Sequence, residues 1–529
     1  MPMKRPAASA GFAGFRRAAA ALLGAAALAL AGCATPPAWQ KPPAESAPAP
    51  RADSRLTAAE EAIAAVNGPE TSGFNLLERS DRALAWRLAL IDSARYSIDL
   101  QYYVWFGDTL GRLMMDRVIK AADRGVRVRI LFDDLNTMLH DMTHVELRDE
   151  LLARIDRHPS IQIRVFNPWH ERSIAGRVFG GLADFGRLNR RMHNKQLIVD
   201  NRAAIIGGRN LGDEYFGLNP DFNFYDLDVL GIGPVARQAS AVFDRYWNSD
   251  WVRAIPKPEG EGEALAESEL GAGAMAELLA NPSLVTLGAG RRDWSPEIAG
   301  LPALLAPGQS EVHTDSPVRD AATRNHMPDA IRALMRSAQR ELLITNAYII
   351  PDANFIADLA ELAGRGVRVR ILTNSLSSHD VPAVNSHYGP WRGRIHATGA
   401  ELFELRSDAL LRSEIVDLPP LVSGFVGLHT KAMVIDRERA FIGSMNLDPR
   451  SEVINSEMGV IIASPPLAVE LARRMERDMG GDNAWQVIAA ADGSLRWRST
   501  AGELDRQPAR NFLQRIEDFV FKFFPASLY

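Results

Sequence analysis

The chain has a single cysteine, Cys33, in 529 residues. One thiol cannot form an internal disulfide, so the folded protein must depend on its hydrophobic core for stability. Hydrophobic residues make up 47% of the chain and charged residues 24%, which is ordinary globular composition, and the length suffices for two or three domains. The sequence therefore excludes a disulfide scaffold and predicts a large globular protein.

Long apolar runs are also scarce, and the chain has no excess of positive charge. No stretch after Cys33 is long and apolar enough to span a bilayer. The formal net charge is −5, and removal of residues 1–32 would leave 56 basic and 65 acidic residues, a net charge of −9. Non-specific binding to nucleic acid depends on cationic side chains that release counterions. We therefore expect no nucleic-acid partner, although local basic clusters could serve a phosphate-bearing ligand.

The N-terminus has the pattern of an export signal. Four basic residues precede an apolar run at 18–31, which is too short to span a bilayer comfortably but fits the core of a signal peptide. The run ends in Leu30-Ala31-Gly32-Cys33, which resembles the lipobox of bacterial lipoproteins, whose cysteine is acylated. We expect residues 1–32 to be a lipoprotein signal peptide and Cys33 to be the lipidation site. The alternative is an ordinary cleaved signal with an incidental cysteine.

Residues 33–58 are expected to form a tether. The segment 34–55 contains six prolines among Ala, Ser and charged residues, a composition that favours an extended and partly stiff chain. Ala34 directly after the cysteine favours sorting to the outer membrane over the inner one. The sequence therefore predicts a membrane-anchored lipoprotein that faces the periplasm.

The pattern His-x-Lys-x4-Asp-x6-Gly-x-x-Asn occurs twice. The first copy consists of His193, Lys195, Asp200, Gly207 and Asn210, and the second of His429, Lys431, Asp436, Gly443 and Asn446. The octapeptide Arg-Gly-Val-Arg-Val-Arg-Ile-Leu also occurs twice, beginning at Arg124 and Arg365. The octapeptides are 241 residues apart and the histidine patterns 236, and such similar offsets indicate an internal duplication. Two copies with identical spacing predict one site built from two halves.

Strand and helix patterns follow the same order in both halves. The first half has expected strands at 96–103 and 126–132 around a helix at 110–124, and the second has strands at 342–348 and 367–372 around a helix at 354–364. This order implies sheets covered by helices. We predict an α/β protein with two similar lobes at 59–254 and 319–490, a connecting insert at 255–318 and an amphipathic tail at 491–529.

Each histidine pattern is expected to form a β-hairpin. Side chains two positions apart on a strand point to the same face, so each histidine shares a face with its lysine. One imidazole can attack phosphorus and form a phosphohistidine, while the other protonates the leaving alkoxide and later deprotonates the incoming alcohol. Lysines and asparagines can hold the phosphate oxygens and the charge that develops on them. The pattern therefore predicts phosphodiester transfer, which in this form needs no metal or other cofactor.

The doubled pattern resembles the signature of the phospholipase D superfamily, and the resemblance covers most of the chain after the tether. Flanking runs at 99–103, 187–192, 373–376 and 446–451 resemble those of bacterial cardiolipin synthases, in particular of cardiolipin synthase C. The resemblance implies two phospholipase D-like lobes, related by a pseudo-two-fold axis, with the site at their interface.

The resemblance also implies roles for individual residues. The catalytic residues would be His193, Lys195, His429 and Lys431, with His193 favoured as the nucleophile. The substrate-binding residues would be Asn210, Asn446 and Ser444. The first copy departs from the family pattern, because Gly208 stands where the second copy has Ser444, and one half-site therefore lacks a hydroxyl donor to phosphate.

Four acidic residues are expected to support the site. Asp200 and Asp436 belong to the repeated pattern and are expected to brace the hairpins rather than to touch substrate. Asp228 and Glu457 follow the two copies, and we expect each to orient the histidine of its own copy through the ring nitrogen not used in chemistry. The alternative for this second pair is a solvated acid at a strand edge.

The implied activity is that of a phosphatidyltransferase that makes cardiolipin from phosphatidylglycerol and a second phospholipid, either phosphatidylethanolamine or phosphatidylglycerol. The alternative is a phospholipase D hydrolase that releases phosphatidic acid. A phosphodiester nuclease and a non-catalytic scaffold rank lower, since the chain is acidic and keeps every His, Lys and Asn of the pattern. The expected partners are phospholipids at a membrane surface, with no obligatory protein partner.

Three other features have two interpretations each. The segments 172–191 and 512–524 mix apolar and basic residues and either meet the membrane interface or pack against the lobes. The polar stretch 379–388 either contacts substrate or is a plain surface loop. His140 and His144 have the spacing of a helical zinc pair, but no third ligand is apparent and we expect no metal site.

Overall fold

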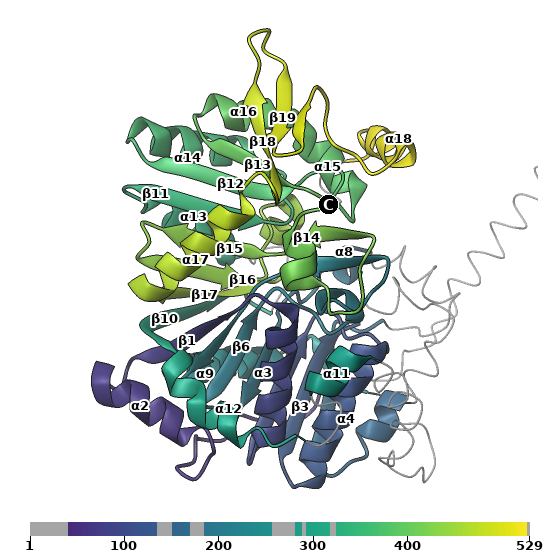
Figure 1. Ribbon diagram of the computed structural model, residues 1–529. Coiled ribbons are helices and arrows are strands. Elements are labelled where there is room, and N and C mark those ends of the chain that lie inside the picture. Colours follow the sequence, from purple (N-terminus) through teal and green to yellow (C-terminus); the bar gives the residue numbers. More distant parts are fainter. Residues whose placement is uncertain are drawn as a thin grey trace, which may run out of the picture. The chain divides into compact units, whose positions relative to one another are not determined.

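The computed structural model describes residues 41–134, 151–169, 185–255, 281–287, 292–317 and 324–525. Two α/β lobes follow each other along the chain, coloured from purple to teal and from teal-green to yellow in Figure 1. The predicted fold class, an α/β protein with two similar lobes, is confirmed. The predicted signal peptide and Cys33 lie outside the described residues. Within the described ranges, no helix has both the length and the apolarity that crossing a membrane requires.

The strands of both lobes have the same topology. In the N-terminal lobe β2, β3 and β4 are parallel neighbours, and β5, β6 and β8 continue antiparallel from β2. In the C-terminal lobe β11, β12 and β13 are parallel, and β15, β16 and β17 continue antiparallel from β11. The first set spans Ser97–Tyr102 (β2), Arg127–Asp133 (β3), Ile161–Phe166 (β4), Gln196–Val199 (β5), Ala203–Gly207 (β6) and Asp228–Ile232 (β8). The second set spans Glu341–Asn346 (β11), Arg368–Asn374 (β12), Glu401–Leu405 (β13), Lys431–Ile435 (β15), Arg439–Gly443 (β16) and Met458–Ala463 (β17).

A strand that the sequence did not predict joins the two lobes. β10 (Ala306–Thr314) lies inside the expected connecting insert at 255–318, yet it pairs antiparallel with β1 (Ser72–Leu77) and with β17. Its burial pattern is irregular, so the alternation of apolar and polar residues that marks a strand is weak. The two sheets therefore form one continuous surface, and the lobes cannot separate without breaking backbone hydrogen bonds.

Helices cover both faces of this sheet (Figure 1). One face of each lobe has its own core: α3 and α4 pack on the N-terminal lobe, and α13, α14 and α16 on the C-terminal lobe. The opposite face is shared, because α9 and α17 both contribute buried side chains to one cluster with strands of both lobes. The bounds are Ser80–Ser93 (α3), Thr109–Asp123 (α4), Pro234–Trp247 (α9), Met327–Arg336 (α13), Ala353–Gly364 (α14), Arg392–Ala397 (α16) and Pro465–Asp478 (α17).

The repeated octapeptide has the same structural task in both lobes. Its glycine, Gly125 or Gly366, follows the end of α4 or α14 with φ of +87° or +78°, a left-handed conformation that glycine adopts without strain. The chain then turns directly into β3 or β12, whose Val and Ile side chains enter the cores. The octapeptide is therefore a helix stop followed by a core strand.

Two predicted boundaries differ from the structure. The expected tether at 33–58 is docked on the N-terminal lobe from its described start: Glu45 forms an ion pair with Arg127 at 2.6 Å, and the carbonyl of Pro48 accepts a hydrogen bond from Asn201. Pro-rich segments keep their carbonyls unpaired, and polar side chains of the lobe donate to them here. The C-terminal lobe also extends past residue 490, because β19 (Leu495–Ser499) and β20 (Gly502–Leu504) add to its sheet through β18 (Ala484–Ala489).

Candidate active site

The two histidine patterns form hairpins as predicted. β5 and β6 are joined by Asp200 and Asn201, and β15 and β16 by a turn that begins with Asp436; these three residues have φ between +51° and +56°. The carboxylate of Asp200 accepts hydrogen bonds from backbone amides at the start of β2, including that of Tyr96 at 2.8 Å. Asp436 does the same at the start of β11, where it accepts from the amide of Arg340 at 2.7 Å. Both aspartates thus fasten a hairpin to its neighbouring strand.

Each histidine is held by the opposite lobe. The backbone amide of His193 donates to the carbonyl of Ser456 at 2.8 Å, and that of His429 donates to the carbonyl of Tyr225 at 2.8 Å. Tyr225 belongs to β7 (Phe222–Tyr225), which pairs in parallel with β14 (Phe425–Leu428) of the other lobe. These crossed contacts bring the two half-sites together, so the structure places one site at the lobe interface.

The histidine rings are oriented by crossed acids. Nδ1 of His193 lies 2.8 Å from Oε2 of Glu457, and Nδ1 of His429 lies 2.6 Å from Oδ2 of Asp226. All four side chains are buried. A carboxylate on Nδ1 sets the tautomer and leaves Nε2 for chemistry.

This arrangement corrects the predicted assignment of acids. We expected Asp228 to orient His193 and Glu457 to orient His429, but Glu457 holds His193 and Asp226 holds His429. Gly207 pairs with Asp228 in β8, and the equivalent Gly443 pairs with Gly459 in β17, so the structural equivalent of Glu457 is Asp226. The loop before the acid is five residues longer in the first copy, which shifts the repeat offset and hides the equivalence in the sequence.

Asp228 has a structural contact instead. Its Oδ2 accepts from Arg87 at 2.9 Å and from Arg209 at 3.0 Å, and all three side chains are about 1% exposed. Arg209 also donates to the carbonyl of Leu77 at 2.7 Å. This buried cluster anchors the strand that begins two residues after Asp226.

The difference between Gly208 and Ser444 follows from the difference between the two acids. A Cβ at Gly208 would lie 2.3 Å from Oδ1 of Asp226, so the short carboxylate occupies the space of a serine side chain. In the other half-site Ser444 donates its hydroxyl hydrogen to Oε2 of Glu457 at 2.5 Å and accepts from the amide of Met458 at 3.0 Å. The hydroxyl that we expected to bind phosphate therefore supports the acid that holds His193.

The lysines and asparagines line the same site. Nζ of Lys195 donates to the carbonyl of His193 at 2.7 Å, and Nζ of Lys431 donates to that of His429. Oδ1 of Asn210 accepts from the amide of Val104 at 3.2 Å, and the same side chain also hydrogen-bonds to Tyr215 beside His429. Oδ1 of Asn446 is buried and has no hydrogen-bond partner. Both lysines act on the ionisation of His193 and of His429, so the basic groups of the two half-sites lie close together.

Burial controls the ionisation of the histidines and lysines. Desolvation, reinforced by Lys431, lowers the pKa of His429 to about 4, and desolvation together with both lysines lowers the pKa of His193 well below its usual range. Desolvation also lowers the pKa of Lys431 to about 8 against the attraction of Asp226, and it lowers the pKa of Lys195. Both imidazoles are therefore neutral near pH 7 when no anion is bound.

The two acids differ in their ionisation. Burial raises the pKa of Glu457 to about 7, although Lys195 and Ser444 oppose this. Burial acts in the same direction on Asp226, but His429, Lys431 and Arg209 outweigh it and lower the pKa of Asp226 below its ordinary value. Asp226 is therefore ionised over a wider pH range than Glu457. Its negative charge stabilises protonated His429 more than Glu457 stabilises protonated His193.

Sequence reasoning missed several residues around the site. Asp315 accepts a hydrogen bond from the amide of Glu457 at 2.9 Å and so fixes the acid that holds His193. Tyr103 lies edge-on to His193 with ring centroids 4.9 Å apart, and Tyr215 lies edge-on to His429 at 5.3 Å. None belongs to the repeated pattern; Tyr103 ends the flanking run 99–103 that carries the family resemblance, whereas no sequence signal separated Asp315 and Tyr215 from ordinary core residues.

The stretch 379–388 was expected to be a polar loop, but only its first residues are one: Pro382–Tyr388 form helix α15, and the loop before it contacts the site. His379 is 2% exposed and its ring stacks on that of Tyr348 at 5.2 Å, while Asp380 accepts a hydrogen bond from the hydroxyl of Tyr348 at 2.6 Å. Tyr348 in turn lies 6.4 Å from the ring of His429. The loop therefore forms part of the wall of the second half-site.

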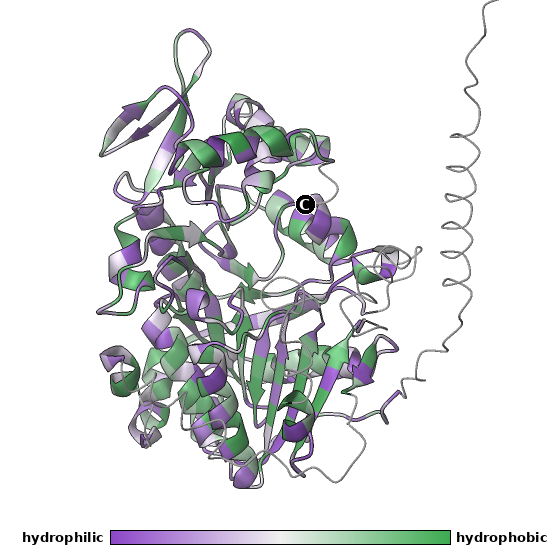
Figure 2. Ribbon diagram, turned by 90° about the vertical axis from the view of Figure 1, so that its right-hand side faces the viewer, coloured by the Kyte–Doolittle hydropathy of each residue, from purple (hydrophilic) through white to green (hydrophobic). Residues whose placement is uncertain are grey.

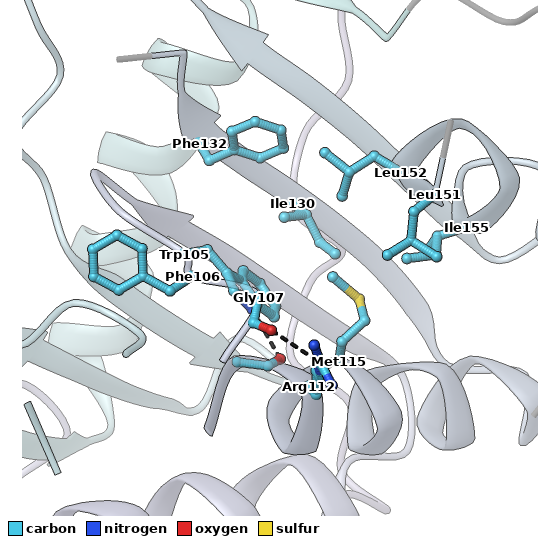
Figure 3. A pocket seen from close by; sticks show the side chains of 11 residues that line it. Trp105, Phe106, Gly107, Arg112, Met115, Ile130, Phe132, Leu151, Leu152 and Ile155 are labelled. Carbon is cyan, nitrogen blue, oxygen red and sulfur yellow. Dashed lines mark hydrogen bonds between the residues drawn. The ribbon is translucent and has the colours of Figure 1, made fainter. Parts of the chain in front are cut away.

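An apolar pocket of about 100 Å³ lies in the N-terminal lobe (Figure 3). Trp105, Phe106 and Met115 line one side, and Ile130 and Phe132 of β3 the other. None of the paired His, Lys and Asn residues belongs to its lining, so it is distinct from the candidate active site. Its lining suits hydrocarbon rather than phosphate.

Several predicted features fall outside the described residues. His140, His144 and most of the segment 172–191 are among them. Within the residues that are described, His, Cys, Asp and Glu side chains form no group of three that could hold a metal ion.

A two-lobed α/β fold with paired His-Lys hairpins that meet at the lobe interface defines an enzyme of the phospholipase D superfamily. The chain belongs to the cardiolipin synthase family with a phospholipase D-like domain, whose model, "Cardiolipin synthase, PLD-like domain", matches residues 88–247 and 331–479. It is 35% identical to cardiolipin synthase C of Escherichia coli, covering 85% of this chain and 94% of the relative. It is 26% identical to cardiolipin synthase B of Shigella flexneri, covering 74% and 77%.

A solved structure has the same fold. The phosphatidylserine synthase of Haemophilus influenzae superposes with a TM-score of 0.54 at 13% identity, covering 80% of this chain and 91% of that one. At that identity the likeness supports the architecture alone.

Gly208→Ala tests the link between this glycine and Asp226. The added Cβ must displace the carboxylate from His429, and loss of a hydrogen bond to a charged group costs about 1.5–3 kcal/mol, or roughly 10- to 100-fold in kcat. Gly364→Ala, where an added Cβ meets nothing within 4 Å, is the matched control. Steady-state kinetics together with thermal unfolding separate a site effect from a loss of fold.

A double-mutant cycle identifies the cause of that loss. If the clash with Asp226 is responsible, Gly208→Ala combined with Asp226→Ala is no worse than Asp226→Ala alone. Additive losses would show that Gly208 acts on something other than this carboxylate.

Proposed function

We propose that this protein is a phosphatidyltransferase that makes cardiolipin from phosphatidylglycerol and a second phospholipid, either phosphatidylethanolamine or phosphatidylglycerol. The observation that carries the proposal is the crossed pairing of two buried histidines with acids of the opposite lobe, next to two lysines and two asparagines. Membership of the cardiolipin synthase family supports the choice of lipid substrates.

The proposed reaction has two steps. Nε2 of His193 attacks the phosphorus of the donor lipid, and Nε2 of His429 gives its proton to the departing head-group oxygen. The primary hydroxyl of phosphatidylglycerol then loses its proton to His429 and attacks phosphorus, which releases His193. Lys195, Lys431, Asn210 and Asn446 hold the non-bridging oxygens in both steps.

The assignment of His193 as nucleophile rests on the unequal acids. A nucleophile must be neutral, whereas a general acid must carry a proton, and Asp226 remains ionised beside His429 while burial pushes Glu457 towards its neutral form. Burial and Lys431 lower the pKa of His429 to about 4, and the negative charge of a bound phosphodiester is expected to raise it. Substrate binding would then protonate His429, the general acid, before the head group leaves.

The location of the protein is part of the same proposal. Cys33 would carry the lipid anchor after removal of residues 1–32, and the protein would face the periplasm from the outer membrane. The support is the lipobox-like sequence at 30–33 and Ala34 after it.

Labelled phosphatidylglycerol in mixed micelles, with and without phosphatidylethanolamine, tests the activity. We expect cardiolipin as the main product, and its formation only with both lipids would identify phosphatidylethanolamine as the donor. Phosphatidic acid as the main product would instead assign a hydrolase. Full activity of His193→Ala or His429→Ala would refute the catalytic roles altogether.

A lipid with p-nitrophenol as its head group separates the two histidines. This leaving group departs without protonation, so His429→Ala is expected to release one equivalent of nitrophenol and to keep the labelled phosphatidyl group on His193. His193→Ala is expected to release none. Acid quench and peptide mapping provide the measurement, and the opposite pattern would reverse the assignment.

The affinity for phosphate is expected to depend on pH through Lys431. Its pKa of about 8 means that the ammonium is charged below pH 8 and loses its proton as the pH rises through that value. In the His193→Ala protein, calorimetric binding of a short-chain phosphatidylglycerol is therefore expected to weaken above about pH 8. Arginine keeps its charge at these pH values, so Lys431→Arg in the same background should reduce the dependence, and the part that remains is assigned to Lys195, whose pKa burial also lowers. An unchanged dependence would mean that another group titrates.

A further inference from the structure

The last helix of the chain buries its polar side and exposes its apolar side. In α18 (Phe512–Phe521) the polar residues Gln514 and Asp518 are each 3% exposed and face the protein. The apolar residues of the helix and of the turn after it face away, and we call them the aromatic face: Phe512, Leu513, Ile516, Phe519, Val520, Phe523 and Phe524. α18 projects at the right of Figure 1, the side that faces the viewer in Figure 2. An ordinary surface helix has the opposite orientation.

Specific hydrogen bonds hold this orientation. The carboxylate of Asp518 accepts from Nδ2 of Asn385 at 2.5 Å and from Nε2 of Gln507 at 3.0 Å. Gln514 donates to the carbonyl of Leu376, and the side chain of Asn511 caps the helix by accepting from the amide of Gln514 at 2.9 Å. Rotation of the helix to bury its apolar residues would break all of these contacts, so exposure of the aromatic face is built into the fold.

Exposed apolar residues are concentrated on this face. Fifteen large apolar side chains are exposed in the described parts of the chain, and seven of them lie between residues 512 and 524. Phe512 and Phe523 are each 76% exposed. Scattered single apolar residues are normal on a protein surface, whereas a contiguous group marks an interaction site.

The aromatic face is connected to the active site. Arg510, just before α18, donates to the carbonyls of Ser377 and His379, and its guanidinium lies 3.6 Å from the ring centroid of Phe425 in β14. The ring of His379 stacks on Tyr348, whose ring is 6.4 Å from that of His429. The helix and the wall of the second half-site therefore share one loop.

We propose that α18 docks the enzyme on a bilayer, with the aromatic face in the interface between head groups and acyl chains, and so holds the second half-site at the membrane surface. A ten-residue helix is too short to span but suits binding in the plane of the interface. Arg515 on the same helix can reach anionic head groups while the phenyl rings enter the acyl region, whereas Lys522, directly after the helix, pairs with Asp518 at 3.8 Å. The inference rests on the proposed function, since phospholipid substrates reside in such a bilayer.

A fluorescent probe tests the depth of α18 directly. Cys33 is the only cysteine, so Cys33→Ala gives a full-length chain to which one thiol can be added for an environment-sensitive dye. Phe523→Cys, in the aromatic face, is compared with Val66→Cys on α2 (Thr57–Asn67), where the native side chain is 83% exposed. With vesicles of phosphatidylethanolamine and phosphatidylglycerol, we expect a blue shift and a gain in intensity at position 523 and none at 66. Equal responses at both positions would overturn the proposal, because the N-terminal segment alone would then account for binding.

The same probe tests whether the aromatic face binds a second copy of this chain instead. If the emission at position 523 shifts with protein concentration before any vesicles are added, the aromatic face is an interface between copies of this chain and the proposal fails. No shift without vesicles is expected.

An activity assay separates this proposal from the proposed function. Phe519→Ser with Phe523→Ser is expected to lower kcat/KM on vesicles about tenfold and to leave turnover of a short-chain lipid below its micellar concentration within about twofold. Val66→Ser with Leu304→Ser, both exposed apolar positions elsewhere, is the matched control. Loss on neither substrate would reject docking by α18, whereas inactivity of the unaltered enzyme on both would reject the proposed function instead.

Discussion

The reciprocal hydrogen bonds between each histidine and the opposite lobe are the interaction on which the site depends. His193 bonds through its ring to Glu457 and through its amide to Ser456, while His429 bonds to Asp226 and to Tyr225. Neither lobe alone can orient its own imidazole. The continuous sheet through β10, together with the core shared by α9 and α17, holds the lobes at the separation these bonds require. Duplication therefore produced two incomplete halves that only function as a pair.

The two half-sites have the same fold but differ in the acid that holds the histidine and in the residue next to that acid. Asp226 fills the space beside Gly208, and His429, Lys431 and Arg209 keep it ionised. The longer Glu457 leaves room for Ser444, which donates to it, and its pKa is about 7. The departure at Gly208, which in the sequence resembles the loss of a phosphate ligand, is better understood as the steric counterpart of a shorter acid. Because the two acids differ, the two histidines of an otherwise symmetric fold can differ in protonation, as a nucleophile and a general acid must.

Much of the fold could be predicted from local patterns. The octapeptides, the hairpins around the Asp turns and the strand-helix-strand order all depend on residues close together in the sequence, and they lie within one or two residues of their predicted positions. The prediction of secondary structure and boundaries failed where contacts between residues far apart in the sequence determine the structure. β10 lacks a clear alternation and is a strand because β1 and β17 lie on either side of it. The Pro-rich segment from residue 41 is docked because donors on the lobe meet its carbonyls.

For the site, the sequence by itself determined the candidate residues, two His, two Lys and two Asn with a common spacing, and through the family pattern the class of enzyme. Only the tertiary structure decided which acid holds which histidine, that Ser444 serves Glu457, and that the last helix presents its apolar side outwards. The physical reason is that spacing along a strand sets which side chains share a face, whereas a contact across lobes depends on loop lengths and packing hundreds of residues away. A five-residue difference between two loops was enough to hide Asp226.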